Sequence, residues 1–442
     1  MNRLETNTGQ KETSAIAQLQ AKLGQKAKQE PNFRFYTLYG HLCKDDVLHE
    51  AWKVVRRNGG SAGIDNISFR DIETSREGVL GFLKGIQESL QNKAYHPKPV
   101  KRVYIPKSDG KLRPLGIPTI RDRVVQAALL LLIEPIFEQD FLDCSYGFRP
   151  ERSAHQAIDA IKSAIADGKT QVYDADLKGY FDSIPHDNLM KAIERRIADQ
   201  QVLKLILKWL RAPVWEKGKS MTSNDKGTPQ GGVISPLLAN IYLHWFDKIF
   251  HGPNGPGSWA KAKLVRYADD FVIMARFLTK RVTTWIEARL EGKFGLTINQ
   301  EKTKIIDLDA PKGQLDFLGF TMRKEIVRNA PWRKYCKDQP SKKSLKKAKE
   351  MIREYTSPKN GYKPIAEVVK RLNLFLRGWG QYFSKGYPSE AFSSINAYTD
   401  ERVEHFLHRR SQRGYKKDRK SKTWYQEMRR LGVMQLTKQL FV

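Results

Sequence analysis

Residues 266–276 read RYADDFVIMAR, and Asp269 and Asp270 stand side by side inside this otherwise apolar run. Two adjacent ionised carboxylates repel each other, and burying them without partners is costly. The apolar residues on both sides predict two strands that meet in a hairpin at the acidic pair. Tandem acids are common at turns, so the pair alone does not identify a function.

A second stretch, VYDADLKGYFDSI (172–184), predicts a strand that carries further carboxylates. Side chains alternate along a strand, so Asp174 and Asp176 share one face. If this strand lies beside the hairpin, Asp176 and Asp269 converge at the sheet edge, with Asp270 next to them. Three carboxylates in one place need cations, and Mg²⁺ prefers one or two carboxylates together with phosphate oxygens and water. Two such ions can support nucleotidyl transfer.

The elements around these strands predict an α+β domain. Residues 126–325 follow the order strand, helix, strand, strand, helix, strand, which is that of the split βαβ unit. We expect one helix over 153–168, one long amphipathic helix over 186–210 and one over 236–250, which begins at Pro236.

The two ends of the chain are more polar. Residues 1–35 predict a flexible arm with one short helix at 15–28. After about residue 330 the pattern is helical, with 27 lysines and arginines against 10 aspartates and glutamates from Pro331 onward. Tyr415, Trp424 and Tyr425 either stack on unpaired RNA bases or pack on the protein body. One helix presents a basic stripe that we expect to bind RNA, made of Lys342, Lys343, Lys346, Lys347 and Arg353.

Composition points to a nucleic acid partner. The 442 residues carry a formal charge of +30, which favours a polyanion, and no amphipathic anchor or long apolar segment suggests a membrane. The three cysteines match no paired spacing, which argues against a disulfide framework or a zinc ribbon. The polar start resembles neither a signal nor a transit peptide. We therefore expect a reducing compartment, the cytoplasm.

These residues together resemble the group II intron-encoded reverse transcriptase and maturase family. YADD (267–270) is similar to the reverse transcriptase signature, and blocks in the family's order cover about residues 40–325. Many members carry a Cys-paired HNH-type endonuclease, and the sequence is similar to the bacterial type that lacks it. The further matching blocks are NGGSAGIDNISFRDIE (58–73), PKSDGKLRPLGIPTIRDRVVQ (106–126), YGFRPERSAHQAI (146–158), DLKGYFDSIPHDNL (176–189), GTPQGGVISPLLANIYL (227–243), LTINQEKTKI (296–305), FLGFTMR (317–323) and RGWGQYF (377–383).

The resemblance implies a right-hand polymerase with fingers, palm and helical thumb. Asp176 matches the first catalytic aspartate, and Asp269 and Asp270 match the pair on the second strand. These side chains and the Leu177 carbonyl are the implied ligands of two Mg²⁺ ions. Phe181 matches the bulky residue that leaves no room for a ribose 2′-hydroxyl, although a core aromatic is the alternative.

The resemblance also implies contacts with substrates. Arg can grip a triphosphate bidentately and Lys as a point charge, while glycines let the backbone approach the nucleotide and template. The implied residues for binding deoxynucleoside triphosphates (dNTPs) are Lys107, Arg113, Phe181, Gln230 and Lys302. Those for the RNA template and DNA primer are Gly231, Gly232, Leu318 and Gly319.

Five regions follow from the pattern and the resemblance. They are a flexible arm (1–35), fingers (36–125), a palm with inserted fingers elements (126–328), a helical thumb or maturase region (329–400) and a short basic extension (401–442) that binds RNA or DNA.

Two alternatives to an RNA-directed DNA polymerase that also binds its intron RNA stay open. One is a splicing cofactor that binds RNA without catalysis, which degenerate polymerase residues would favour. The other is a domesticated relative in DNA repair, phage defence or CRISPR adaptation, which only the flanking genome would identify.

Overall fold

The computed structural model describes residues 15–106, 110, 112–218, 220–222, 224–327, 330–411 and 413–441. The chain forms two compact units. The first consists of Met1–Ser153, Ala175–Ile273 and Leu278–Thr303, and the second of Ala154–Asp174, Met274–Phe277 and Lys304–Val442. None of the described helices is long and apolar enough to cross a bilayer.

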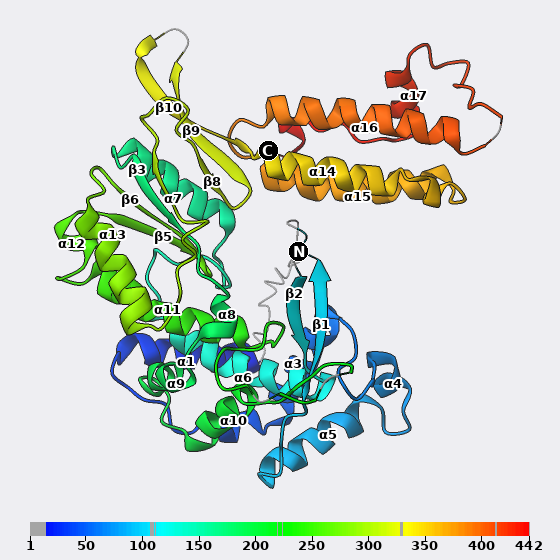
Figure 1. Cartoon of the computed structure of the whole chain (residues 1–442). Coiled ribbons are helices and arrows are strands. Elements are labelled where there is room, and N and C mark those ends of the chain that lie inside the picture. Colours follow the sequence, from blue (N-terminus) through cyan, green and yellow to red (C-terminus); the bar gives the residue numbers. More distant parts are fainter. Residues whose placement is uncertain are drawn as a thin grey trace, which may run out of the picture. The chain divides into compact units, whose positions relative to one another are not determined.

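A four-stranded sheet with the order β5-β6-β3-β7 carries the acidic motifs (Figure 1). Its strands are β3 (Gln171–Ala175), β5 (Lys263–Tyr267), β6 (Asp270–Ala275) and β7 (Lys304–Asp307). β3 and β7 pair antiparallel, and the two apolar motif strands β6 and β3 are neighbours. This order confirms the split βαβ arrangement, because β6, which follows β5 in the chain, lies between β5 and β3 in space.

The first unit is built around two buried helices, α6 (Ile120–Glu138) and α11 (Ser235–His251). Pro236 lies in the first turn of α11, as expected, where its missing N–H costs nothing. The predicted helix over 186–210 is wrong in its length, since the chain forms α9 (His186–Glu194) and α10 (Gln200–Leu210). The side chain of Asp199 accepts hydrogen bonds from the backbone N–H groups of Gln201 and Val202, and this cap starts a new helix.

The N-terminal segment is also different from the expectation. The predicted short helix is present as α1 (Ala15–Gln29), but it is packed rather than flexible. Ile16, Leu23 and Ala27 are buried, and Gln20 Nε2 donates to the Leu131 carbonyl of α6 at 3.0 Å. Apolar residues spaced along one helical face give α1 enough burial to dock on α6.

Between Leu38 and Ile117 the described residues form four helices and two paired strands. Helix α3 ends at Gly59, whose φ of +64° suits a residue without a Cβ. β1 pairs antiparallel with β2 and parallel with the short strand β4. The elements are α2 (Leu38–Leu42), α3 (Asp45–Asn58), α4 (Phe69–Thr74), α5 (Gly78–Gln91), β1 (Val100–Pro106), β2 (Leu112–Ile117) and β4 (Val214–Trp215).

The remaining elements of the first unit are short. They are α8 (Tyr180–Ser183), α12 (Pro256–Trp259), α13 (Lys280–Glu287) and the π-helical turn η1 (Ala288–Lys293).

The second unit combines an antiparallel sheet with a helical bundle. The expectation of helix directly after residue 330 is wrong, because β10 pairs with β9 from Lys334 to Pro340. This pairing between strands, rather than local preference, makes residues 334–340 extended. The elements are α7 (Ala154–Ala166), β8 (Leu315–Phe317), β9 (Phe320–Val327), β10 (Ala330–Pro340), α14 (Lys342–Tyr355), η2 (Pro358–Asn360), α15 (Ile365–Phe383), α16 (Ser389–Arg409), α17 (Trp424–Arg430) and η3 (Lys438–Phe441).

Candidate active site

Two carboxylates lie at the ends of the two central strands of the four-stranded sheet. Asp176 directly follows β3, and Asp269 lies in the turn between β5 and β6. Burial raises the pKa of the Asp269 carboxyl; its own backbone N–H and the charge of Arg113 oppose the rise, and the charge of Asp176 adds to it. Two like charges in a partly dry place favour the approach of a cation.

Residues after η1 hold Asp176 in place. Its Oδ2 accepts hydrogen bonds from Asn299 Nδ2 at 3.0 Å and from Lys302 Nζ at 3.4 Å. The Asn299 N–H donates to the Asp176 carbonyl at 2.8 Å, so Asn299 holds both the backbone and the side chain of Asp176. The side chain of Lys302 remains 59% exposed. An exposed pair of this kind is weak and easily exchanged. Lys302 can therefore leave Asp176 when a stronger partner arrives.

A buried arginine supports the turn that carries Asp269. Arg266 Nη1 donates to the Ala268 carbonyl at 3.0 Å and to Asn240 Oδ1 at 2.9 Å. Its Nε and Nη2 donate to the carboxylate of Asp247. Ala268 has a φ of +59°. This conformation is unfavourable for a residue with a Cβ and has to be stabilised by its surroundings.

The expected convergence of three carboxylates is not found. In the part of the chain that the structure describes, no three His, Cys, Asp or Glu side chains lie close enough to hold a metal ion. Asp270 begins β6 and is exposed, and Asp174 lies on β3 opposite Lys304 of β7. Asp176, Asp269 and the Leu177 carbonyl still offer an oxygen donor set that fits Mg²⁺, which completes its shell with phosphate oxygens and water.

Two of the candidate dNTP-binding residues, Arg113 and Phe181, lie on β2 and α8. Arg113 is exposed on β2 and near enough to Asp269 to influence its pKa. Phe181 is half-buried in α8, its carbonyl accepts from the Thr228 N–H at 2.6 Å, and its ring meets the edge of Tyr180. Lys107 lies outside the described residues.

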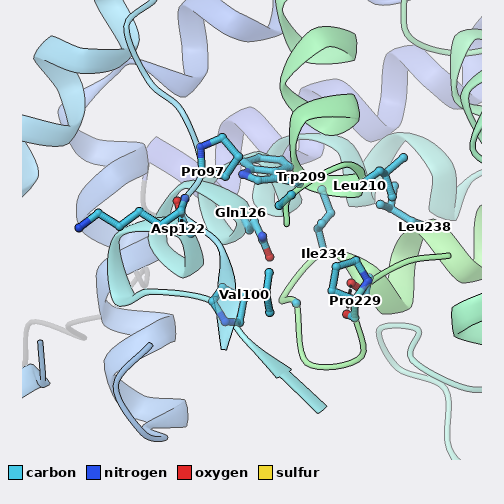
Figure 2. A pocket seen from close by; sticks show the side chains of 14 residues that line it. Pro97, Val100, Asp122, Gln126, Trp209, Leu210, Pro229, Ile234 and Leu238 are labelled. Atoms are coloured by element: carbon cyan, nitrogen blue, oxygen red, sulfur yellow. Dashed lines mark hydrogen bonds between the residues drawn. The ribbon is translucent and has the colours of Figure 1, made fainter. Parts of the chain in front are cut away.

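The loop of residues 230–232, which carries the candidate dNTP residue Gln230 and the candidate template residues Gly231 and Gly232, packs against β2. Gly116 N–H donates to the Gln230 carbonyl at 2.6 Å, and Gly231, with a φ of +114°, leaves no room for a Cβ beside the Gly116 carbonyl. Gln126 Oε1 accepts from the Val233 N–H at 2.8 Å. Figure 2 shows Gln126 at the pocket behind this loop. The volume of the pocket is about 20 Å³. Such a volume admits no more than a water molecule, so the loop is a rigid support for β2.

The candidate primer-contacting residues belong to the second unit. Leu318 and Gly319 form the β8–β9 turn with φ of +47° and +83°. Tyr382 donates its hydroxyl to the Leu318 carbonyl at 2.8 Å, and Ser344 donates its hydroxyl to the Gly319 carbonyl at 2.8 Å. The helices of the second unit thus hold the turn in its strained conformation.

The basic stripe lies on α14 of the same unit, and all its members are exposed: Lys342, Lys343, Lys346, Lys347 and Arg353. The aromatic residues further on are divided. Tyr415 and Trp424 stack on each other with ring centroids 6.2 Å apart, while Tyr425 is exposed.

Sequence reasoning missed the residues that hold the site, namely Arg266, Asp247, Asn299 and Tyr382. Arg266 directly precedes the YADD motif, and an arginine inside an apolar strand signals a buried partner. Nothing in the sequence identified that partner as Asp247.

The comparisons with known proteins agree with this geometry. Residues 105–322 match the family described as "Reverse transcriptase (RNA-dependent DNA polymerase)", and residues 345–424 match "Group II intron, maturase-specific domain". Protein YkfC of Escherichia coli is 37% identical over 325 residues, which are 66% of this chain and 84% of that protein. Group II intron-encoded protein LtrA of Lactococcus lactis is 32% identical over 362 residues, with 65% of this chain and 57% of that protein covered.

Among solved structures, a telomerase from Candida albicans in complex with a fragment of telomeric RNA has a TM-score of 0.41 and 11% identity, covering 80% of this chain and 71% of that one. A partial Cas6-RT-Cas1–Cas2 complex has a TM-score of 0.34 and 21% identity, covering 58% of this chain and 43% of that one.

Proposed function

The chain belongs to the group II intron-encoded reverse transcriptase and maturase family, and on this premise we propose that Asp176 and Asp269 are the carboxylates that carry its RNA-directed DNA synthesis. The observation that supports this assignment most directly is the position of the two side chains on neighbouring strands, since Asp176 directly follows β3 and Asp269 directly precedes β6. The substrates are an RNA template, a DNA primer and dNTPs.

The family uses divalent metal ions, and we propose two Mg²⁺ ions held by Asp176, Asp269 and the Leu177 carbonyl. When bound, they supply positive charge that activates the primer 3′-hydroxyl and stabilises the leaving pyrophosphate. Asp270, exposed at the start of β6, is a more tolerant neighbour that acts through its charge.

The chain's own residues position the substrate. Asn299 orients the Asp176 carboxylate, and Lys302 moves from Asp176 to the triphosphate, where it meets the negative charge that develops. Arg113, Gln230 and Lys107 contact the incoming nucleotide in this proposal. Phe181 excludes the ribose 2′-hydroxyl.

The glycines at 231 and 232 bring backbone to the template, and the turn at Leu318 and Gly319 contacts the primer. We propose the regions 36–125, 126–328 and 329–400 as fingers, palm and thumb, and 401–442 as a nucleic-acid-binding extension. The exposed stripe on α14 contacts phosphates of the parent intron RNA, in the bacterial cytoplasm, where the free cysteines Cys43, Cys144 and Cys336 stay reduced.

Primer extension tests this function. Wild type, Asp269→Asn and the exposed control Asp187→Asn are each given an RNA template, a DNA primer, Mg²⁺ and dNTPs. We expect cDNA from wild type and control, and a rate lower by roughly a thousandfold for Asp269→Asn, since loss of a metal-binding charge removes several kcal/mol of stabilisation. If wild type makes no cDNA while it still binds RNA, the protein is a splicing cofactor without polymerase activity.

A further inference from the structure

A short stretch of backbone, residues 144–147, runs beside the turn that carries Asp269. Two backbone hydrogen bonds, of 2.9 Å and 2.7 Å, join it to Arg266. A Cβ on Gly147 would lie 2.4 Å from the Ala268 nitrogen, so only a glycine fits at this close approach. The next side chain along the chain therefore starts one residue away from the contact with the catalytic turn.

Phe148 is that next residue, and its backbone conformation is unfavourable. Its φ is +55°, a value that a bulky side chain rarely adopts. The backbone is held there from both sides. Asn240 Nδ2 donates to the Gly147 carbonyl at 2.8 Å, and the buried Arg149 forms a salt bridge of 2.6 Å with Glu138. Strain that the surroundings impose in this way is typical of functional sites.

The ring of Phe148 contributes little to the core. It is 53% exposed, although Gly147 and Arg149 on either side of it are buried. A glycine at position 148 would adopt the same φ without strain. Folding alone therefore does not account for an aromatic residue that is both strained and exposed. A ligand that covers the ring does account for it, since functional residues often lower stability.

The chemistry of the ring indicates which ligand surface it contacts. A phenylalanine ring has no charge and no hydrogen-bonding group, so it does not select phosphate. The proposed function brings the 3′ end of a DNA primer, paired with RNA, to Asp269. Stacking covers the faces of the bases inside such a duplex, and the sugars are the apolar surface that remains. An A-form helix displays its sugars along a wide, shallow minor groove.

We propose that Phe148 packs against sugars in the minor groove of the RNA–DNA hybrid, next to the reacting 3′ end, and so holds the primer terminus at the carboxylate pair. This inference rests on the proposed function. It gives a role to the block 146–158, which resembles the family in sequence and has no other role in that function. Because the backbone around Phe148 is already held, little conformational freedom is lost when the hybrid binds.

The test compares three variants of the full-length protein with wild type. Phe148→Gly removes both the ring and the strain, whereas Phe148→Leu keeps the strain and an apolar side chain. Phe277→Gly, at a ring that is 77% exposed, is the control. Melting temperatures report on the fold. Fluorescence anisotropy in EDTA gives the affinity for an RNA–DNA hybrid with a recessed primer 3′ end, and the affinity for the same RNA without primer.

We expect Phe148→Gly to melt at or above the wild-type temperature, because the strain is relieved. It should bind the hybrid roughly tenfold more weakly, with unchanged affinity for RNA alone. Phe148→Leu and Phe277→Gly should bind the hybrid within about threefold of wild type. Equal hybrid affinity of Phe148→Gly and wild type overturns the proposal. A lower melting temperature of Phe148→Gly, with hybrid and RNA affinity falling together, also overturns it and indicates a packing role.

Primer extension by wild type separates this inference from the proposed function. If wild type makes cDNA and all variants bind the hybrid equally, only the contact at Phe148 is overturned. If wild type makes no cDNA, the polymerase function is overturned, while a selective loss of hybrid affinity in Phe148→Gly still supports the contact with the hybrid.

Discussion

The guanidinium of Arg266 and the carboxylate of Asp247 form a salt bridge of 2.6 Å, and neither side chain is exposed to solvent. The same guanidinium donates to the Ala268 carbonyl, one residue before Asp269. Asp247 on α11 thus neutralises the charge of Arg266 on β5. Nη1 of Arg266 supports the turn that carries Asp269. Removing one partner of such a pair leaves a buried charge without compensation.

We predict that Asp247→Asn lowers the free energy of unfolding by about 3–5 kcal/mol, because Arg266 stays buried without its counter-charge. Urea unfolding measures the loss. The control is Asp143→Asn, whose carboxylate meets Arg152 at 2.5 Å with 89% of the Asp143 side chain exposed. The expected loss for this control is below about 1 kcal/mol. Similar losses for both variants would contradict a special role for the buried pair.

Arg266 also has an expected kinetic effect. Arg266→Lys keeps the charge but cannot donate to Asp247, Asn240 and Ala268 at once. We expect kcat to fall with little change in KM for dNTP, because the turn that carries Asp269 loses its support. A change in KM alone would show that Arg266 does not position the turn.

Phe181→Ala should admit ribonucleotides. The smaller side chain leaves room for the 2′-hydroxyl, so discrimination between dNTP and rNTP, measured as the ratio of kcat/KM values, should fall roughly 10- to 100-fold. The control is Phe277→Ala, whose ring is 77% exposed. Unchanged discrimination in Phe181→Ala would return this residue to a packing role.

Tyr382→Phe should weaken primer binding. The variant removes the hydrogen bond to the Leu318 carbonyl and leaves the ring packed. The turn becomes less rigid at a cost of about 1 kcal/mol. We expect a higher KM for primer–template and an unchanged KM for dNTP. Tyr335→Phe is the matched control, because its hydroxyl donates a hydrogen bond of 3.1 Å to Glu325 on the neighbouring strand β9, away from the turn. Equal effects would argue against a primer role of the turn.

The palm strands and their acidic residues were predictable because alternation along a strand is a local property. Contacts that join distant residues were not. Asp247 meets Arg266 through tertiary packing, and residues 334–340 become a strand only because β9 offers a partner. The break before α10 had a local signal, the capping residue Asp199, that the apolar periodicity on both sides concealed.

The stripe on α14 should determine the salt dependence of RNA binding. RNA affinity falls with salt, and each phosphate contact that is lost reduces the steepness of log K against log salt by about 0.7 for single strands. The fourfold change of Lys342, Lys343, Lys346 and Lys347 to Gln should therefore flatten the slope. The control changes four exposed lysines away from the stripe to Gln, namely Lys204, Lys312, Lys359 and Lys370. An equal change in both proteins would indicate diffuse charge rather than a stripe.

Glu134 on α6 should make the stability depend on pH. Burial, together with the nearby charge of Glu138, raises the pKa of Glu134 from 4.5 to about 7. Between these values the folded state binds more protons than the unfolded state, so stability falls as pH rises from about 4.5 to 7. After allowance for partial exposure, we expect a contribution of about 2 kcal/mol. Glu134→Gln should raise the melting temperature at pH 8 and leave it nearly unchanged at pH 5. The control Glu88→Gln, at an exposed position on α5, should leave the melting temperature unchanged at both pH values. The prediction is contradicted if Glu134→Gln and wild type differ in melting temperature by the same amount at pH 5 and pH 8.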